Sequence, residues 1–133
     1  VPVLSSYGIS HVVTSQWERC AATMAPYEDH TRIKSLPMDV LTEASHERNP
    51  ALVVQAVTQL MENDQAAALC THRPVLATLF GALSQWASPA LAKAIPRKDP
   101  YLAPGTALVA HVARAPGRAP RIVGIEIVHP VIF

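Results

Sequence analysis

The sequence predicts a single α/β domain in which a three-layer, mainly parallel sheet is flanked by helices and followed by a β-hairpin. Three observations support this prediction. Short apolar runs alternate with stretches of helical periodicity, which is typical of parallel sheets. Residues 66–71 are almost continuously apolar, as expected for an interior strand covered by helices on both faces. Two alternating runs around a Pro-Gly turn near the C-terminal end predict the hairpin.

Composition limits the classes of protein that fit. The 133 residues suit one domain, since a domain usually takes roughly 100 to 200 residues. Half of the residues are hydrophobic and 16% are charged, a balance that supports a buried core and excludes global disorder. The net charge of +1, with scattered basic residues, gives no footprint for polymeric nucleic acid. No apolar run approaches the ~20 residues of a membrane span, so we expect a cytoplasmic protein without membrane contact.

The two cysteines lie in different predicted elements. Cys20 falls in a helix and Cys70 in a buried strand, without a CxxC pattern. Reduced thiols are therefore expected rather than a disulfide. The histidine and cysteine positions do not give metal-ligand spacing, so no metal site is expected.

The first part of the chain predicts a strand, a polar turn and a helix. Residues 1–8 are typical of the end of a helix that stops at Gly8. Residues 9–13 form a short apolar strand that ends at Thr14 and Ser15. Ser15 can cap a helix over residues 16–25, which Pro26 is expected to stop.

A second short strand is predicted within residues 31–37, followed by a loop over residues 39–48. Asn49 and Pro50 favour the start of a helix, which Asn63 ends. Its core face is given by apolar residues at helical spacing, namely Leu52, Val53, Ala56, Val57, Leu60 and Met61.

The strand over residues 66–71 leads directly to His72, Arg73 and Pro74. A helix over residues 75–86 follows, and a shorter helix begins at Ser88 and Pro89 and ends before Pro96. Residues 106–114 and 121–128 form the predicted hairpin, expected at or near one edge of the sheet.

Two polar side chains follow strands of the predicted sheet. Arg19 lies near the start of the helix after the first strand, and His72 lies at the tip of the apolar strand. Ligands collect at the carboxyl ends of parallel strands, where helix N-termini also point. Arginine suits phosphate, and histidine can donate to a phosphoryl oxygen or move a proton. Either residue alone is more typical of a solvated helix position or a helix cap, so the pattern by itself supports only a weak anion site.

Three segments resemble the histidine phosphatase superfamily of the phosphoglycerate mutase type. VVTSQWERCAATMAP is similar to the segment in which a strand ending in Ser is followed by an Arg, LTEA to a Leu-x-Glu segment, and CTHRPVL to the second-histidine motif. The match is closest to the C-terminal domain of proteins that fuse a Nudix (MutT-type) hydrolase to a histidine phosphatase. It includes LAPGTALVAHVA and covers residues 9–128.

The resemblance implies a role for each site residue. Arg19 would be the second phosphate-binding arginine, with Ser15 beside it. His72 would stabilise charge on the transferring phosphoryl group. Glu43 would be the general acid, although Glu47 in the same predicted loop is an alternative and an exposed loop glutamate is as readily a solubilising residue. Arg73 would add positive charge or line the rim of the site.

One departure from the family is serious. The family's nucleophile is the histidine of an Arg-His-Gly motif, and no such motif occurs in this sequence. We therefore expect residues 1–133 to be a partial domain lacking the N-terminal strand and the start of the first helix, and inactive alone. An unpaired strand edge recruits other chains, so we expect the absent segment to be retained, swapped from a neighbour or replaced by a homodimer contact.

Two functions from different classes remain open at this point. In the first, the intact protein hydrolyses a phosphate ester or nucleotide through a phosphohistidine, needing no cofactor except Mg²⁺ for an upstream Nudix domain. In the second, the domain binds phosphate without catalysis, or serves as a scaffold for a partner domain. The small phosphorylated ligand is common to both, and its identity is left open.

Overall fold

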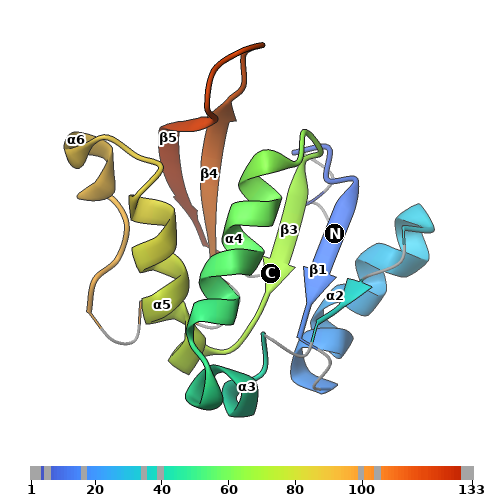
Figure 1. The fold of residues 1–133 in the computed structure, drawn as a ribbon. Helices are drawn as coiled ribbons and strands as arrows, with labels where there is room; N and C mark the ends of the chain where they lie inside the picture. The colour runs from blue at the N-terminus through green and yellow to red at the C-terminus, as the bar shows by residue number, and fades with distance from the viewer. Residues whose placement is uncertain are drawn as a thin grey trace.

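The computed structural model describes residues 4, 7–15, 18–33, 36–38, 41–98, 101–103 and 106–129, with only the backbone of Glu18, Arg19 and Ala21. Within these ranges the chain is a mixed α/β structure with a three-stranded parallel sheet flanked by helices and a C-terminal antiparallel hairpin (Figure 1). The elements in chain order are β1 (His11–Thr14), α2 (Glu18–Thr31), β2 (Leu36–Pro37), α3 (Glu43–Arg48), α4 (Ala51–Glu62), β3 (Ala67–Cys70), α5 (Arg73–Ser84), α6 (Pro89–Ala92), β4 (Ala107–Ala113) and β5 (Arg121–Val128).

The parallel sheet has the strand order β2-β1-β3. The register pairs Val13 with Leu36 and Thr14 with Cys70, so β1 and β3 end side by side. The residues that follow these two strands, Ser15 and Thr71, therefore leave the sheet at the same edge. This edge is where the sequence predicts an anion site.

Helices cover both faces of the sheet. Successive residues of a strand point to opposite faces, and in β3 they meet two different apolar clusters. Leu69 packs against the cluster formed by α4 and α5, whereas Ala68 and Cys70 pack against a smaller cluster formed by Val12, Met24 and Tyr27. The predicted layers of helix, sheet and helix are present around the parallel strands.

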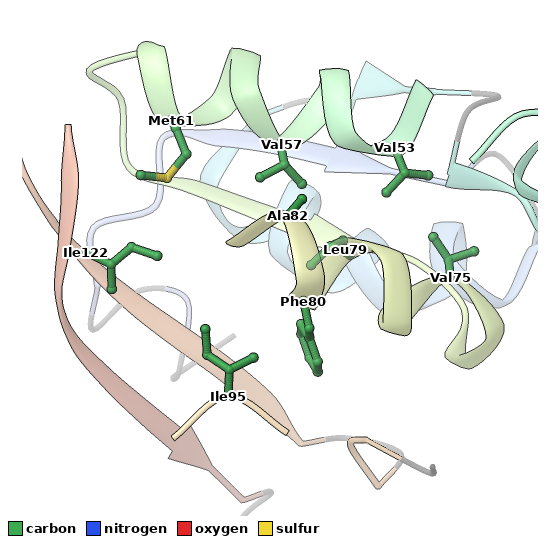
Figure 2. Packing of buried hydrophobic residues seen from close by; sticks show 9 residues of the cluster. All are labelled: Val53, Val57, Met61, Val75, Leu79, Phe80, Ala82, Ile95 and Ile122. Carbon is green, nitrogen blue, oxygen red and sulfur yellow. The ribbon is translucent and has the colours of Figure 1, made fainter. Parts of the chain in front are cut away.

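The larger cluster joins α4, α5 and the hairpin. Figure 2 shows Val53, Val57 and Met61 of α4 pointing toward α5, as their helical spacing predicts. The cluster is completed by Val75, Leu79, Phe80 and Ala82 of α5, by Ile122 of β5 and by Ile95, which follows α6. The predicted start of α4 at Asn49 and Pro50 and its end at Asn63 are confirmed by the N-cap at Pro50 and the C-cap at Asn63. Of the predicted core face, Leu52 and Leu60 are only half-buried.

The helix after β1 is longer than the sequence predicts. Pro26 was expected to stop it, but α2 runs on to Thr31 with Pro26 inside. Proline removes one helical hydrogen bond, and tertiary packing offsets that loss here. The Tyr27 ring is buried against Val12 and Met24, and the Tyr27 hydroxyl donates a 2.5 Å hydrogen bond to the carbonyl of Ile9.

The prediction of a loop over residues 39–48 is wrong for the second half of this segment. Residues 43–48 form α3, whose N-cap is Thr42, with Ser45 N–H donating to the Thr42 hydroxyl over 3.2 Å. The cap satisfies a backbone donor that a helix start otherwise leaves unpaired, which lets this short polar segment become helical. The predicted second strand is shorter than expected, because Thr31 ends α2 and β2 comprises only Leu36 and Pro37.

The hairpin is confirmed, and the described residues show how it is attached. It forms its own two-stranded sheet, with Ala107 paired to Val128 and Ala113 to Arg121, and Gly117 adopts a φ of 76° in the turn. Ile122 N–H donates to the Trp86 carbonyl over 2.8 Å. Within the described residues, the hairpin is attached to the end of α5 rather than hydrogen-bonded to the edge of the parallel sheet.

The predicted helix end over residues 1–8 falls mostly outside the described residues, although Gly8 has the left-handed φ of 62° that suits a helix terminus. None of the described helices is both long and apolar enough to cross a membrane.

Candidate phosphate-binding site

The carboxyl ends of β1 and β3 bring Ser15 and His72 into contact. Ser15 Oγ and His72 Nε2 lie 2.9 Å apart, and the exposed fractions of the two residues are 0% and 6%. The hydroxyl donates when Nε2 is unprotonated and accepts when Nε2 carries hydrogen. The residues are separated by 57 positions in the chain, and the parallel pairing of β1 with β3 is what brings them together.

His72 is held at the junction of strand and helix. It has an extended backbone, with φ −109° and ψ 151°, and is the N-cap residue of α5. Its side chain makes no capping hydrogen bond, and Val75 N–H instead donates to the His72 carbonyl over 2.9 Å. The imidazole is therefore not used to cap the helix, and it turns toward Ser15.

Cys20 forms the third side of this cluster. Its Sγ lies 3.8 Å from His72 Nε2, and the residue is 2% exposed. The pKa of Cys20 is lowered to about 7, chiefly by its interaction with Cys70, against the opposing effect of burial, with smaller contributions from hydrogen bonds of Thr14 and Ser15. The pKa of Cys70 is raised by the same interaction, then by burial and by the charge on Cys20.

Arg19 can be located by its backbone alone. It precedes Cys20 in the first turn of α2, next to the residue whose sulfur contacts His72. Its side chain lies outside the described part of the structure. The predicted convergence of Arg19 with His72 therefore stays a prediction.

Glu43 begins α3, and this helix start lies beside the end of β3. The Thr71 hydroxyl donates a 2.7 Å hydrogen bond to the carbonyl of Leu41, two residues before Glu43. Glu43 is half-buried, whereas Glu47 is exposed. Arg73 is exposed at the first position of α5, which suits a residue at the rim.

Sequence reasoning missed the two cysteines and Thr14 as parts of this cluster. Their place follows from the strand register, which the structure gives and the sequence alone does not: Thr14 and Cys70 are the last residues of neighbouring parallel strands. Within the described residues, no group of three or more His, Cys, Asp or Glu side chains has an arrangement that could hold a metal ion. The polar groups of the cluster are two hydroxyls, an imidazole and two thiols, which can bind an anion or move a proton.

Comparison with known proteins adds no relative. No protein-family model matches the sequence, and no curated protein matches it either.

Proposed function

We propose that this chain is a histidine phosphatase-like domain, of the kind fused to Nudix (MutT-type) hydrolases, which binds the phosphoryl group of a small phosphate ester or nucleotide. The observation that supports this proposal is the contact between Ser15 and His72. Two buried polar side chains meet where two parallel strands end, and such edges are where α/β proteins bind phosphorylated ligands.

The chemistry of the cluster is compatible with an oxyanion ligand. A protonated imidazole at position 72 and the Ser15 hydroxyl are both donors to phosphoryl oxygens. Arg19 would add the bidentate guanidinium, and Glu43 would protonate a leaving oxygen in the intact enzyme. Because the sequence has no Arg-His-Gly motif, a phosphohistidine nucleophile would have to come from a segment outside these residues.

Calorimetric titration with inorganic phosphate tests the binding site. Arg19→Ala and His72→Asn each remove a charge-assisted hydrogen bond worth about 1.5–3 kcal/mol, so each should weaken binding by about 10- to 100-fold. Arg118→Ala in the exposed hairpin turn and His30→Asn in the exposed last turn of α2 are matched controls that should bind like the wild type.

Circular dichroism of each variant separates a lost ligand contact from a lost fold. The proposal is wrong if the wild-type chain does not bind phosphate, or if folded Arg19→Ala binds it as tightly as the wild type. The same chain should show no turnover of p-nitrophenyl phosphate. Turnover that His72→Asn abolishes would contradict this expectation and would implicate His72 itself in the reaction.

A specific observation also favours the second candidate, a scaffold domain completed by another polypeptide segment. All residues of β3 and β4 are only half-buried although most are apolar. In the described part of the chain, β3 pairs only with β1 and β4 only with β5, which leaves one edge of each strand without a ladder. An added strand or a second copy would cover them.

Light scattering with intact mass measurement tests this candidate. A dimer, or a monomer that retains an additional peptide, supports it. A stable monomer of the mass of these 133 residues contradicts it.

A further inference from the structure

The small net charge of the chain hides an uneven distribution of charged residues. Residues 93–121 contain six basic residues and one acidic residue, Asp99, which gives this region a net charge of +5. The rest of the chain contains five basic and nine acidic residues, a net charge of −4. Asp99 lies outside the described residues. The basic residues are therefore concentrated in one region, although the total is only +1.

The fold brings the two ends of this region together. α6 contacts β5, and Ile95, which follows α6, belongs to the same buried cluster as Ile122 of β5 (Figure 2). In Figure 1, α6 and the turn between β4 and β5 lie at the same end of the molecule. Four exposed basic residues lie close in sequence to Ile95 or Ile122, and we call them the basic patch: Lys93, Arg97, Arg118 and Arg121.

The turn between β4 and β5 holds Arg118 in a fixed place. The Arg118 N–H donates a 3.1 Å hydrogen bond to the carbonyl of Ala115, which closes a β-turn. Pro116 occupies the second position of this turn, and Gly117 occupies the third with a φ of 76°, as a type II turn requires. Because proline fixes its own φ, the turn loses little conformational freedom when a partner binds.

Both ends of the turn are tied to the body of the domain. Arg114, just before the turn, donates hydrogen bonds to the carbonyls of Leu60 and Met61 over 3.3 and 3.2 Å. Ile122, just after the turn, donates its N–H to the Trp86 carbonyl over 2.8 Å. Arg114 is thus used within the fold and is not part of the basic patch. The turn that carries half of the patch is fixed on both sides.

We propose that the basic patch is a docking surface for an acidic segment of a partner protein. No carboxylate of the described residues forms an ion pair with the patch, so its charges are available to a partner. Three of its four residues are arginines, whose planar fork of donors suits carboxylates. Val123, two residues after Arg121, is 49% exposed and adds apolar surface beside these charges.

The composition of this surface favours a protein partner over other polyanions. Arginine beside exposed apolar surface is typical of protein interfaces. Residues 88–98 and 114–123 contain no aromatic side chain, which a single-stranded nucleic acid would need for base stacking. The patch has four cations, fewer than the roughly 6 to 10 phosphate contacts that hold a duplex.

Fluorescence anisotropy with a labelled peptide of glutamate and leucine residues tests this proposal. The peptide should bind the wild-type chain, and its affinity should fall as salt rises, since exposed charges are screened over a Debye length of about 10 Å at 0.1 M. A matched peptide with glutamine in place of glutamate should not bind. The proposal is overturned if the acidic peptide does not bind, if both peptides bind alike, or if duplex DNA or phosphatidylserine vesicles bind more tightly than the acidic peptide.

Paired variants test whether the peptide binds at the basic patch. Arg118→Gln combined with Arg121→Gln removes two exposed charges and should weaken binding of the acidic peptide by about 2- to 30-fold. Arg32→Gln combined with Arg48→Gln removes two exposed arginines elsewhere and should bind the peptide like the wild type. Equal affinities of the two double variants would contradict the assignment.

A variant of the proposed phosphate site is a second control. His72→Asn should bind the acidic peptide like the wild type, because His72 follows β3 in the parallel sheet and the patch surrounds the start of β5. Loss of peptide binding in folded His72→Asn would place the peptide at the phosphate site and overturn the proposal. If a patch variant fails to fold, the comparison of the two peptides on the wild type still decides. None of these measurements uses phosphate, so their failure would leave the proposed phosphate site standing.

Discussion

The anchoring of α2 by Tyr27 is open to a direct thermodynamic test. Cys20, Met24 and Tyr27 lie at helical spacing on one face of α2, and all three are buried. The Tyr27 hydroxyl donates to the carbonyl of Ile9, just before β1, while its ring packs against Val12. Tyr27→Phe keeps the ring and removes only the hydroxyl, so it isolates the hydrogen bond.

The expected loss follows from the burial of Tyr27 and the partial burial of Ile9. Tyr27 is 3% exposed, and the Ile9 carbonyl loses its hydroxyl donor in the variant. A neutral hydrogen bond contributes about 0.5–1.5 kcal/mol, and a buried acceptor left unpaired costs about 1–3 kcal/mol. We therefore expect Tyr27→Phe to lower the free energy of unfolding by about 1–2 kcal/mol.

Urea unfolding followed by far-ultraviolet circular dichroism measures this change. Tyr101→Phe is the matched control: the Tyr101 ring contacts Phe80 with centroids 6.2 Å apart, and its hydroxyl makes no hydrogen bond within the described residues. The control should stay within about 0.5 kcal/mol of the wild type. If Tyr27→Phe is as stable as the wild type, or if both variants lose the same free energy, the hydroxyl does not anchor α2.

Two further measurements test other contacts. Thr42→Ala removes the N-cap of α3 and should lower the free energy of unfolding by about 0.5–2 kcal/mol, whereas Thr106→Ala outside any helix should not. Hydrogen bonds from His111, and to a smaller extent from Tyr7, lower the pKa of Glu126. These hydrogen bonds therefore stabilise the fold above the ordinary glutamate pKa, and their contribution is lost as the pH falls through the lowered pKa of Glu126. The melting-temperature difference between the wild type and Glu126→Gln should thus disappear in acid, and a constant difference would contradict this.

The elements with a local signal could be predicted from the sequence. Residues 51–62 repeat apolar side chains at helical spacing, and residues 107–128 alternate around a turn, so their structure follows from short-range patterns. The short helix at Ser88 was predictable for the same reason, since the Ser88 hydroxyl accepts from Leu91 N–H and Pro89 suits the first helical position.

Two errors arose where tertiary contacts outweigh local preference. Pro26 is a helix breaker by propensity, yet the burial of Tyr27 beyond it keeps the helix intact. The polar segment after Thr42 lacks a helical period, and its helix depends on one cap and on packing beside α4 and α5. Neither the partner of Tyr27 nor the neighbours of α3 can be recognised from adjacent residues.

The site itself was only half predictable, and the reason is the strand register. Strand ends are visible in the sequence, which is how Ser15 and His72 were found. The pairing of Thr14 with Cys70 fixes which side chains meet, and a shift by one residue would turn Cys70 to the opposite face. The contact of Ser15 with His72 therefore depends on a relation that no local pattern encodes.

The cluster also couples the proposed phosphate site to Cys20 through charge. A phosphate dianion bound at Ser15 and His72 would lie beside the sulfur of Cys20, which is 3.8 Å from the same imidazole nitrogen. Two negative charges at such distances repel, so phosphate binding would raise the pKa of Cys20 and keep the thiol protonated. By linkage, the Cys20 thiolate weakens phosphate binding by the same factor.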